Sequence, residues 1–213
     1  RTANAALVAA SETPTIGGGQ QRYNTGGYTQ FTPAAQVDTF ELYYPRRSAN
    51  GSMKVEIDGV AQAPLSQTMG VSDYVKSVVS VARGVHTIKC SNNSGTAWTP
   101  AVVAYDSASP SIICMNAGVR NSTSTDWVTA TWPHSPLPEI GVIAPHLTVI
   151  ALGINDARTG TTTVAQFSAN IQAIIDKCRL SGGVLLMYPT PISSGSYRAD
   201  FTQAQLNGAY DAL

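Results

Sequence analysis

The spacing of apolar residues changes near Ser107–Pro110, and this change constrains the fold more than any other feature. Before it, apolar residues fall in short alternating runs, which are typical of β-strands with one buried face. After it, they fall in continuous runs, which are typical of strands buried on both faces of a parallel sheet. The sequence therefore predicts an antiparallel β-sandwich or jelly-roll module followed by an α/β core.

The first half predicts strands and no helix. Its strand-like segments are Val37–Tyr44, Met53–Ile57, Tyr74–Val81, Val85–Cys90 and Ala101–Tyr105. Asp58-Gly59 is the strongest short signal for a two-residue hairpin turn. A second hairpin is expected around Arg83-Gly84. Closely spaced short strands of this kind favour a sandwich or a jelly roll.

The second half predicts strands that alternate with helices. The expected elements are a buried strand at Ser111–Met115, a short helix at Ser122–Ala130, a buried strand at Leu147–Leu152, a helix that Gly182-Gly183 ends, a buried strand at Val184–Tyr188 and a helix within Phe201–Leu213. Thr163 and Gln166 fit a capping box at the start of the long helix. Its apolar face is formed by Val164, Phe167, Ile171, Ile174, Ile175 and Cys178. This order implies a parallel sheet with right-handed crossovers.

Composition argues against several classes of function. The 13 basic and 13 acidic residues balance, and no basic stripe indicates a nucleic-acid partner. No apolar run reaches the roughly 18 residues that a membrane helix needs. Charged residues make up 12% of the chain, against about 25% in typical domains. This composition favours an extracellular or virion-associated protein. Because the chain starts at Arg1 and shows no signal peptide, we expect a mature terminus or an excised fragment.

The cysteines predict neither a disulfide nor a metal site. Cys90, Cys114 and Cys178 are odd in number and widely spaced, and no C-x-x-C pair occurs. Cys114 and Cys178 lie in apolar runs, where cysteine behaves as a small hydrophobic residue.

Two polar clusters come directly after predicted parallel strands. Asn116-Ala117-Gly118 follows the first strand, and Gly153-Ile154-Asn155-Asp156 follows the second. Ligands of parallel sheets bind at the carboxyl ends of the strands, so we expect Gly118 and Asn155 within about 10 Å of each other. Gly118 would offer its backbone N–H and Asn155 its amide to a developing oxyanion, while Asp156 would hold the loop or Asn155 by hydrogen bonds. The alternative is that both clusters are only turns.

These clusters carry a family resemblance. Leu147–Asp156 (LTVIALGIND) resembles the third conserved block of the SGNH (GDSL-like) hydrolases, and Asn116–Trp127 resembles their second block. Tyr188–Pro191 is similar to the segment after the third strand of those enzymes. Over residues 109–213 the resemblance implies a partial, flavodoxin-like SGNH core. It makes Gly118 and Asn155 the oxyanion donors, with Asp156 in support.

The first half carries a looser resemblance. Residues 16–108 resemble carbohydrate-binding-like sandwich modules inserted between the first and second blocks of some carbohydrate O-deacetylases, including enzymes of bacteriophage tail fibres. Residues 1–15 would then be a remnant of the α/β core or a linker.

The nucleophile and the base of the family are absent. No Gly-Asp-Ser segment occurs, and neither does the family's Asp-x-x-His segment. Ser107 in Ala104–Ser107 is the nearest imitation of the first. Ser111 opens the next predicted strand only four residues later, whereas a parallel crossover needs about a dozen residues. Both catalytic residues are therefore expected outside this chain.

The histidines do not replace the missing base. His146 precedes the strand that Asn155 follows, so roughly 25–30 Å of strand separates them. His134 is expected near the same wrong edge, and His86 within a sandwich strand.

The resemblance implies a fragment of a serine ester hydrolase that removes acetyl groups from a polysaccharide and is inactive alone. It implies no metal or organic cofactor. The expected partners are an acetylated glycan and either other segments of the parent protein or a homo-oligomer. One rival hypothesis is a glycan-binding protein with Tyr23, Tyr28 or Trp98 stacked on sugar. The other is a structural tail-fibre component with a degenerate, inactive esterase fold.

Overall fold

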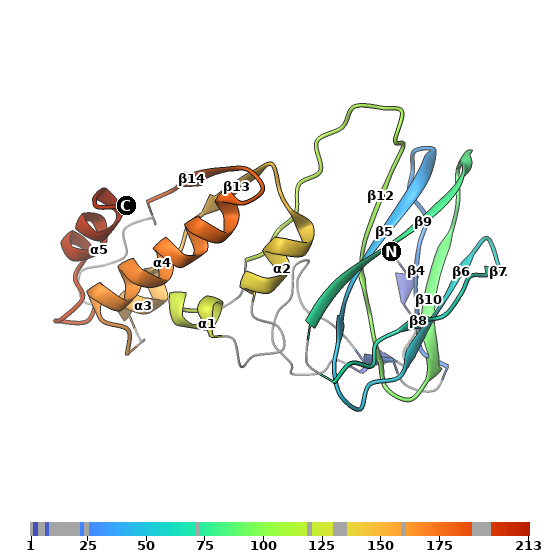
Figure 1. Cartoon of the computed structure of the whole chain (residues 1–213), viewed down its shortest axis with the longest axis horizontal. Coiled ribbons are helices and arrows are strands. Elements are labelled where there is room, and N and C mark those ends of the chain that lie inside the picture. Colours follow the sequence, from blue (N-terminus) through green and yellow to red (C-terminus); the bar gives the residue numbers. More distant parts are fainter. Residues whose placement is uncertain are drawn as a thin grey trace. The chain divides into compact units, whose positions relative to one another are not determined.

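The chain forms two compact units, residues 1–118 and residues 119–213, and each is described by itself (Figure 1). The structure is a computed structural model. It describes residues 2–3, 7–8, 22–23, 26–70, 73–118, 121–129, 136–158, 161–188 and 197–213.

The first unit is a sandwich of antiparallel sheets. One sheet has the order β1 (Thr2–Ala3), β4 (Tyr28–Phe31), β10 (Ile88–Ser94), β6 (Ser52–Ile57) and β7 (Val60–Ala61), with β8 (Leu65–Ser66) also paired to β6. The second has the order β12 (Ala101–Tyr105), β5 (Val37–Arg46) and β9 (Asp73–Gly84). The third has the order β11 (Ala97–Trp98), β3 (Arg22–Tyr23) and β2 (Leu7–Val8).

Alternation along the strands builds the core of this unit. In β6, Met53, Val55 and Ile57 are buried, and the residues between them are half-buried. They share one hydrophobic cluster with Phe40 and Leu42 of β5. Strands of the first two sheets therefore face each other across one core, as a sandwich requires.

The predicted hairpin at Asp58-Gly59 is confirmed. β6 pairs with β7 directly across it. Asp58 has φ 51° and Gly59 has φ 82°. Two consecutive positive φ angles define a type I′ turn, whose twist matches the flanking strands.

The predicted hairpin at Arg83-Gly84 is wrong. β9 continues through Gly84 and pairs with β5, whereas β10 pairs with β4 and β6. The chain crosses between sheets at residues 85–87, so His86 lies in a connection and not in a strand. Alternation predicts which side chains point inward, but it does not predict which strand is the neighbour.

Residues 1–15 were expected to be a remnant of the α/β core or a linker, whereas the four residues described there pair with strands of the first unit. Thr2–Ala3 pairs with β4, and Leu7–Val8 pairs with β3. These short apolar stretches add strands to the antiparallel sheets, because an edge strand still offers unpaired backbone groups.

The second unit is a small parallel α/β arrangement. Its elements are α1 (Ser124–Val128), α2 (Pro136–Ile143), β13 (Leu147–Ile150), α3 (Ile154–Arg158), α4 (Val164–Arg179), β14 (Gly183–Leu186) and α5 (Gln203–Asp211). β13 and β14 are parallel, with Val149 paired to Leu185. Strands are confirmed at the expected positions Leu147–Leu152 and Val184–Tyr188, with slightly different bounds, and so are the three expected helices. Helices α2 and α3 were not expected. The expected burial of the two strands on both faces is wrong, because Leu147, Val149 and Leu185 are 61%, 51% and 53% exposed.

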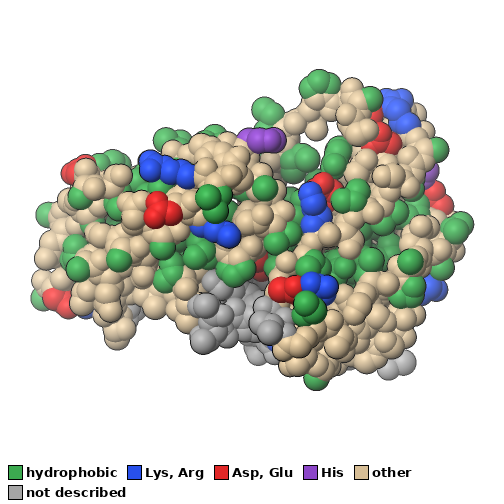
Figure 2. All heavy atoms as spheres, viewed as in Figure 1, with side chains coloured by type: hydrophobic (Ala, Val, Ile, Leu, Met, Phe, Trp, Pro, Cys, Tyr) green, Lys and Arg blue, Asp and Glu red, His purple; other side chains and the backbone are tan. Residues whose placement is uncertain are grey.

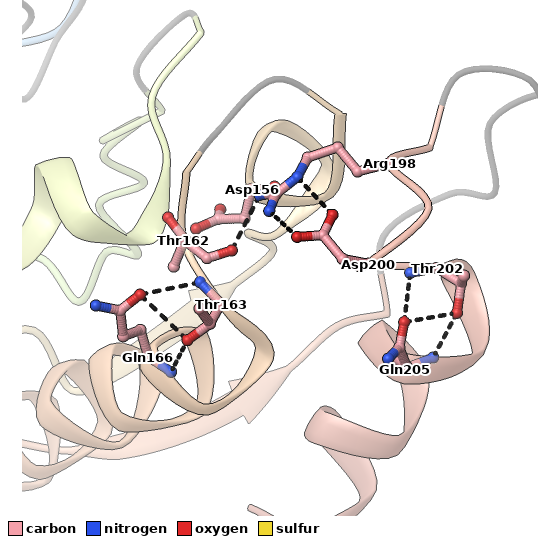
Figure 3. Close-up of polar contacts among 8 residues, drawn as sticks. All are labelled: Asp156, Thr162, Thr163, Gln166, Arg198, Asp200, Thr202 and Gln205. Carbon is pink, nitrogen blue, oxygen red and sulfur yellow. Dashed lines mark hydrogen bonds and ion pairs between the residues drawn. The ribbon is translucent and has the colours of Figure 1, made fainter.

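Helix α4 matches its sequence signals closely. Thr163 Oγ1 accepts a hydrogen bond from Gln166 N at 3.2 Å, and Gln166 Oε1 accepts one from Thr163 N at 3.0 Å (Figure 3). Of the predicted apolar face, Val164 is half-buried and the rest is buried. Gly182 follows the helix where a Cβ would lie 2.3 Å from the carbonyl oxygen of His146. Only glycine fits this close approach of two backbone segments.

The buried strand expected at Ser111–Met115 is wrong. Residues 111–118 form no strand, and Ile112 is 93% exposed. An apolar run becomes a buried strand only where a neighbouring strand and covering layers exist. Within the described residues, the parallel sheet consists of β13 and β14 alone. The units divide after Gly118 and not at residue 108.

Candidate functional site

The candidate site follows β13 at its carboxyl end. Gly153 has φ 110°, and a Cβ there would lie 2.6 Å from a methyl group of Leu206 and 3.0 Å from the ring of Phe167. Glycine at this position therefore lets the chain pass close to the core. Helix α3 begins at the next residue and carries Asn155 and Asp156.

Asp156 fixes the start of α1. Its side chain is fully buried. Its carboxylate accepts hydrogen bonds from Ser124 N at 3.0 Å and from Ser124 Oγ at 2.7 Å. Asn170 of α4 donates to the same Ser124 oxygen at 3.0 Å. Buried carboxylates need such donors to offset their lost hydration. Asp156 was expected to hold its own loop or Asn155, and its observed side-chain partner is Ser124, the first residue of α1.

Asn155 is bound to the same segment. Its Nδ2 donates a hydrogen bond to the carbonyl oxygen of Ser122 at 2.9 Å. A side-chain amide nitrogen carries two hydrogens, so this bond orients the group and uses one of them. The Gly-x-Asn-Asp turn and residues 122–124 therefore meet inside the second unit.

Gly118 belongs to the first unit and does not end a strand. It is exposed, and its N–H donates to Asn116 Oδ1 at 2.8 Å. This is a local turn in which an asparagine side chain binds the backbone two residues on. The position of Gly118 at a strand end is thus wrong, because Ser111–Met115 is not a strand. Its closeness to Asn155 stays a prediction.

Arg198 is a structural residue of the site that sequence reasoning missed. Its Nη1 donates to the carbonyl oxygens of Asp156 at 3.2 Å and Thr162 at 3.0 Å (Figure 3). The same guanidinium binds Asp200 through two hydrogen bonds, which hold the pKa of Asp200 below its ordinary value. Arg198 therefore joins the end of α3 to the loop before α4. The only sequence signal was an arginine two residues before an aspartate, which is too common to predict a contact.

Within the described residues, serine and histidine are not brought together. Ser107 follows β12, and its Oγ donates to Asp38 Oδ2 at 2.5 Å. His146 directly precedes β13, whereas Asn155 lies beyond its other end, as predicted. His86 binds Asp58 in the first unit. His134 and residues 189–191 lie outside the described residues.

The aromatic residues expected to stack on sugar are not available for it. Tyr23 is 2% exposed and Trp98 is 4% exposed. The half-buried Tyr28 has Lys89 Nζ 4.8 Å from its ring centroid. A cavity of about 250 Å³ in this unit is lined by Thr29, Gln30, Phe31, Ile88, Cys90, Pro100, Ala101 and Val102.

Metal-ligating side chains do not gather in the described part of the chain. It holds no group of three or more His, Cys, Asp or Glu side chains placed to bind a metal, and none of its three cysteines is in a disulfide. None of its helices is long and apolar enough to cross a membrane. Positive and negative side chains are interspersed on the face shown in Figure 2.

Comparison with known proteins shows a likeness of fold. No protein-family profile and no curated protein matches the sequence. A peptidoglycan O-acetylesterase structure matches 99% of this chain with a TM-score of 0.53 and 13% identity, and the match spans 61% of that chain. A family 35 carbohydrate-binding module from Paenibacillus barcinonensis covers 50% of this chain and 92% of its own (TM-score 0.37, 13% identity). The match to a CBM36 carbohydrate-binding module in complex with calcium and xylotriose covers 49% of this chain and 99% of the module, with a TM-score of 0.33 and 15% identity.

The chain therefore combines antiparallel sheets with a small parallel α/β unit, and it shares this architecture with the O-acetylesterase, of which it spans about three fifths.

Proposed function

We propose that the chain is part of an SGNH-type serine esterase that removes acetyl groups from a polysaccharide, and that it supplies the oxyanion side of the active site. The observation that carries the proposal is the fixed position of Asn155 after the parallel strand β13, bound to Ser122 O. The shared architecture with an O-acetylesterase supports it.

The chemistry is set by what an ester carbonyl needs during acyl transfer. When a serine oxygen attacks the carbonyl carbon, negative charge develops on the carbonyl oxygen. A neutral N–H donor already held in place stabilises this charge without reorganising during the reaction. Asn155 would be this donor, through its side-chain amide. Asp156 and Arg198 would hold the turn that presents it.

The remaining steps need residues from outside this chain. A histidine would take the proton of the attacking serine and give it to the departing sugar oxygen as the ester C–O bond breaks, which releases the sugar with a free hydroxyl. Water would then hydrolyse the acetyl-enzyme and release acetate. Gly118 is proposed as the second oxyanion donor, which requires that its N–H leave Asn116 Oδ1 in the intact site.

The proposed substrate is an acetylated polysaccharide met outside the cell or on a virion. The second candidate is a glycan-binding or structural component with an inactive esterase fold. It is favoured by the contacts of Ser107 and His86. Ser107 binds Asp38 and His86 binds Asp58, so these contacts do not join a serine to a histidine.

Substitution of Asn155 tests the proposal in the complete polypeptide that contains residues 1–213. Asn155→Ala is expected to lower kcat for an aryl acetate by about 10²–10³, the usual cost of one oxyanion donor. Asn93→Ala, an exposed asparagine that binds Ser52 in the first unit, is the control and should leave kcat unchanged. Thermal unfolding of both variants separates lost folding from lost catalysis.

Undiminished turnover in a folded Asn155→Ala variant would show that the Gly-x-Asn-Asp segment is only a turn. A complete polypeptide that binds acetylated polysaccharide without hydrolysing it would favour the second candidate instead.

A further inference from the structure

Among the described residues, Tyr188 is the only aromatic residue that is more than half exposed, at 53%. It follows β14 at the carboxyl end of the parallel strand pair. Ligands of open α/β sheets bind at this edge. An aromatic ring offers a ligand a large apolar surface that is favourable to remove from water.

Two contacts with α5 hold the ring of Tyr188 in place. Its centroid lies 5.6 Å from that of Tyr210, with 40° between the two ring planes. Its hydroxyl donates a hydrogen bond to Asp211 Oδ1. A side chain that is already fixed loses little freedom when a ligand binds, so the ring is prepared for contact.

Tyr210 connects Tyr188 to the turn that carries Asn155. The Tyr210 hydroxyl accepts a hydrogen bond from Leu152 N at 3.1 Å and donates one to Leu152 O at 2.8 Å. Leu152 directly precedes the Gly-x-Asn-Asp turn, and Asn155 is three residues further on. Three residues of chain span about 10 Å at most. Tyr188 therefore lies one tyrosine ring away from the segment that leads into the candidate site.

The same buried aromatic residues support the ring and the turn. Tyr210 packs on Phe167, with 5.7 Å between the ring centroids. A Cβ at Gly153 would lie 3.0 Å from the Phe167 ring, so the turn rests on this ring as well. Tyr188 and the Gly-x-Asn-Asp turn are therefore held by one packed cluster.

We propose that Tyr188 is a platform on which the polysaccharide stacks one sugar ring while an acetyl group of the same polysaccharide reaches Asn155. The inference rests on the proposed function. A sugar ring has an apolar C–H face and a rim of hydroxyls. Tyr188 matches the face, and the exposed Asp211 has its second oxygen, Oδ2, to accept from a hydroxyl.

A protein partner fits this surface less well. Stable protein interfaces bury about 800 Å² on each side, and one tyrosine beside one carboxylate offers much less. A single aromatic ring does match a single sugar ring in size. The surface therefore favours a saccharide as the ligand.

A comparison of two esters tests the platform in the complete polypeptide. One ester is whichever of O-acetylated xylan and O-acetylated peptidoglycan is hydrolysed faster, and the other is ethyl acetate, which carries no ring. Tyr188→Ala should lower the ratio of kcat/KM for the polysaccharide to kcat/KM for ethyl acetate by about fivefold to tenfold, because only the sugar loses a stacked contact. Tyr188→Phe keeps the ring and should keep most of the ratio.

The matched control is Met187→Ala. Met187 is 52% exposed, and as the neighbouring residue it points to the other side of the chain. Its substitution should leave the ratio unchanged. Equal losses on both esters in Tyr188→Ala would overturn the proposal, because the ring would then only support the turn. An unchanged ratio in Tyr188→Ala, or a natural polypeptide that hydrolyses ethyl acetate and neither polysaccharide, would overturn it as well.

Binding separates this proposal from the proposed function. The complete polypeptide is labelled with 3-fluorotyrosine, and the fluorine NMR signal of residue 188 is assigned by its absence in Tyr188→Phe. Xylotriose or a soluble peptidoglycan disaccharide should shift this signal. A shift in a polypeptide without esterase activity would refute the proposed function and support the platform. No shift with either saccharide would overturn the platform.

Discussion

At the scale of single residues, His86 has an acceptor at each ring nitrogen. Its Nδ1 lies 2.6 Å from Asp58 Oδ2, and its Nε2 lies 2.6 Å from the carbonyl oxygen of Ala82. A carboxylate and a carbonyl oxygen can only accept hydrogen bonds, so the two partners favour the form of His86 that carries hydrogen on both nitrogens. The bond to Asp58, followed by the bond to Ala82, raises the pKa of His86. The bond from His86, followed by the one from Thr87 N, lowers the pKa of Asp58.

These shifts predict a pH-dependent stability for the first unit. The His86 contribution is complete below its ordinary pKa of about 6.5 and is lost as pH rises through the raised pKa. The Asp58 contribution is complete above about pH 4 and is lost as pH falls through the lowered pKa. His86→Gln should therefore lower Tm more at about pH 5.5 than at about pH 9. Thermal unfolding followed by circular dichroism measures this difference.

Asp58→Asn serves as the partner control, because it removes the same ion pair from the other side. In the Asp58→Asn background, His86→Gln should lose most of its pH dependence. An equal drop in Tm at both pH values in the natural background would show that the pair contributes no charge-dependent stability.

At the scale of elements, the sequence predicts best where the signal is local. The capping box of α4, its apolar face and the Asp58-Gly59 turn each depend on residues within a few positions, and all three are observed. The strand at Ser111–Met115 needed a partner far along the chain and does not form. The hairpin at Arg83-Gly84 is wrong because β9 and β10 pair with strands far along the chain and not with each other. Periodicity describes one element's faces, whereas strand pairing is decided by the whole set of elements.

The residues of the candidate site show the same difference between local and distant signals. Asn155 and Asp156 were found from a short motif directly after a strand, and both lie where the motif predicts. Gly118 was placed by a strand that does not form. Arg198 was missed because it reaches Asp156 from 42 positions further along the chain.

The cap of α4 gives a prediction for one element. Thr163→Ala should lower the free energy of unfolding by about 1 kcal/mol, because it removes the acceptor for Gln166 N. Thr163→Ser keeps the hydroxyl and should restore most of the loss. Chemical denaturation measures both, with Thr161→Ala at an exposed neighbouring position as the control. A loss as large for Thr161→Ala would mean that the cap is not the cause.

At the scale of the whole molecule, the proposed function needs more than the described residues provide. The proposed oxyanion side depends on Asn155, whereas the described serines and histidines provide no nucleophile and base in contact. Under the proposed function, the catalytic pair comes from outside these residues.

The most direct test is to compare the hydrolysis of an aryl acetate by residues 1–213 with that by the complete polypeptide at equal concentration. We expect triad-level turnover from the complete polypeptide. Residues 1–213 should show at most the residual catalysis of roughly 10³–10⁴ over water that serine hydrolases retain without triad members. Equal turnover by the two proteins would contradict the proposed division of the active site, because the nucleophile would then lie within these residues. A complete polypeptide without activity would contradict it as well.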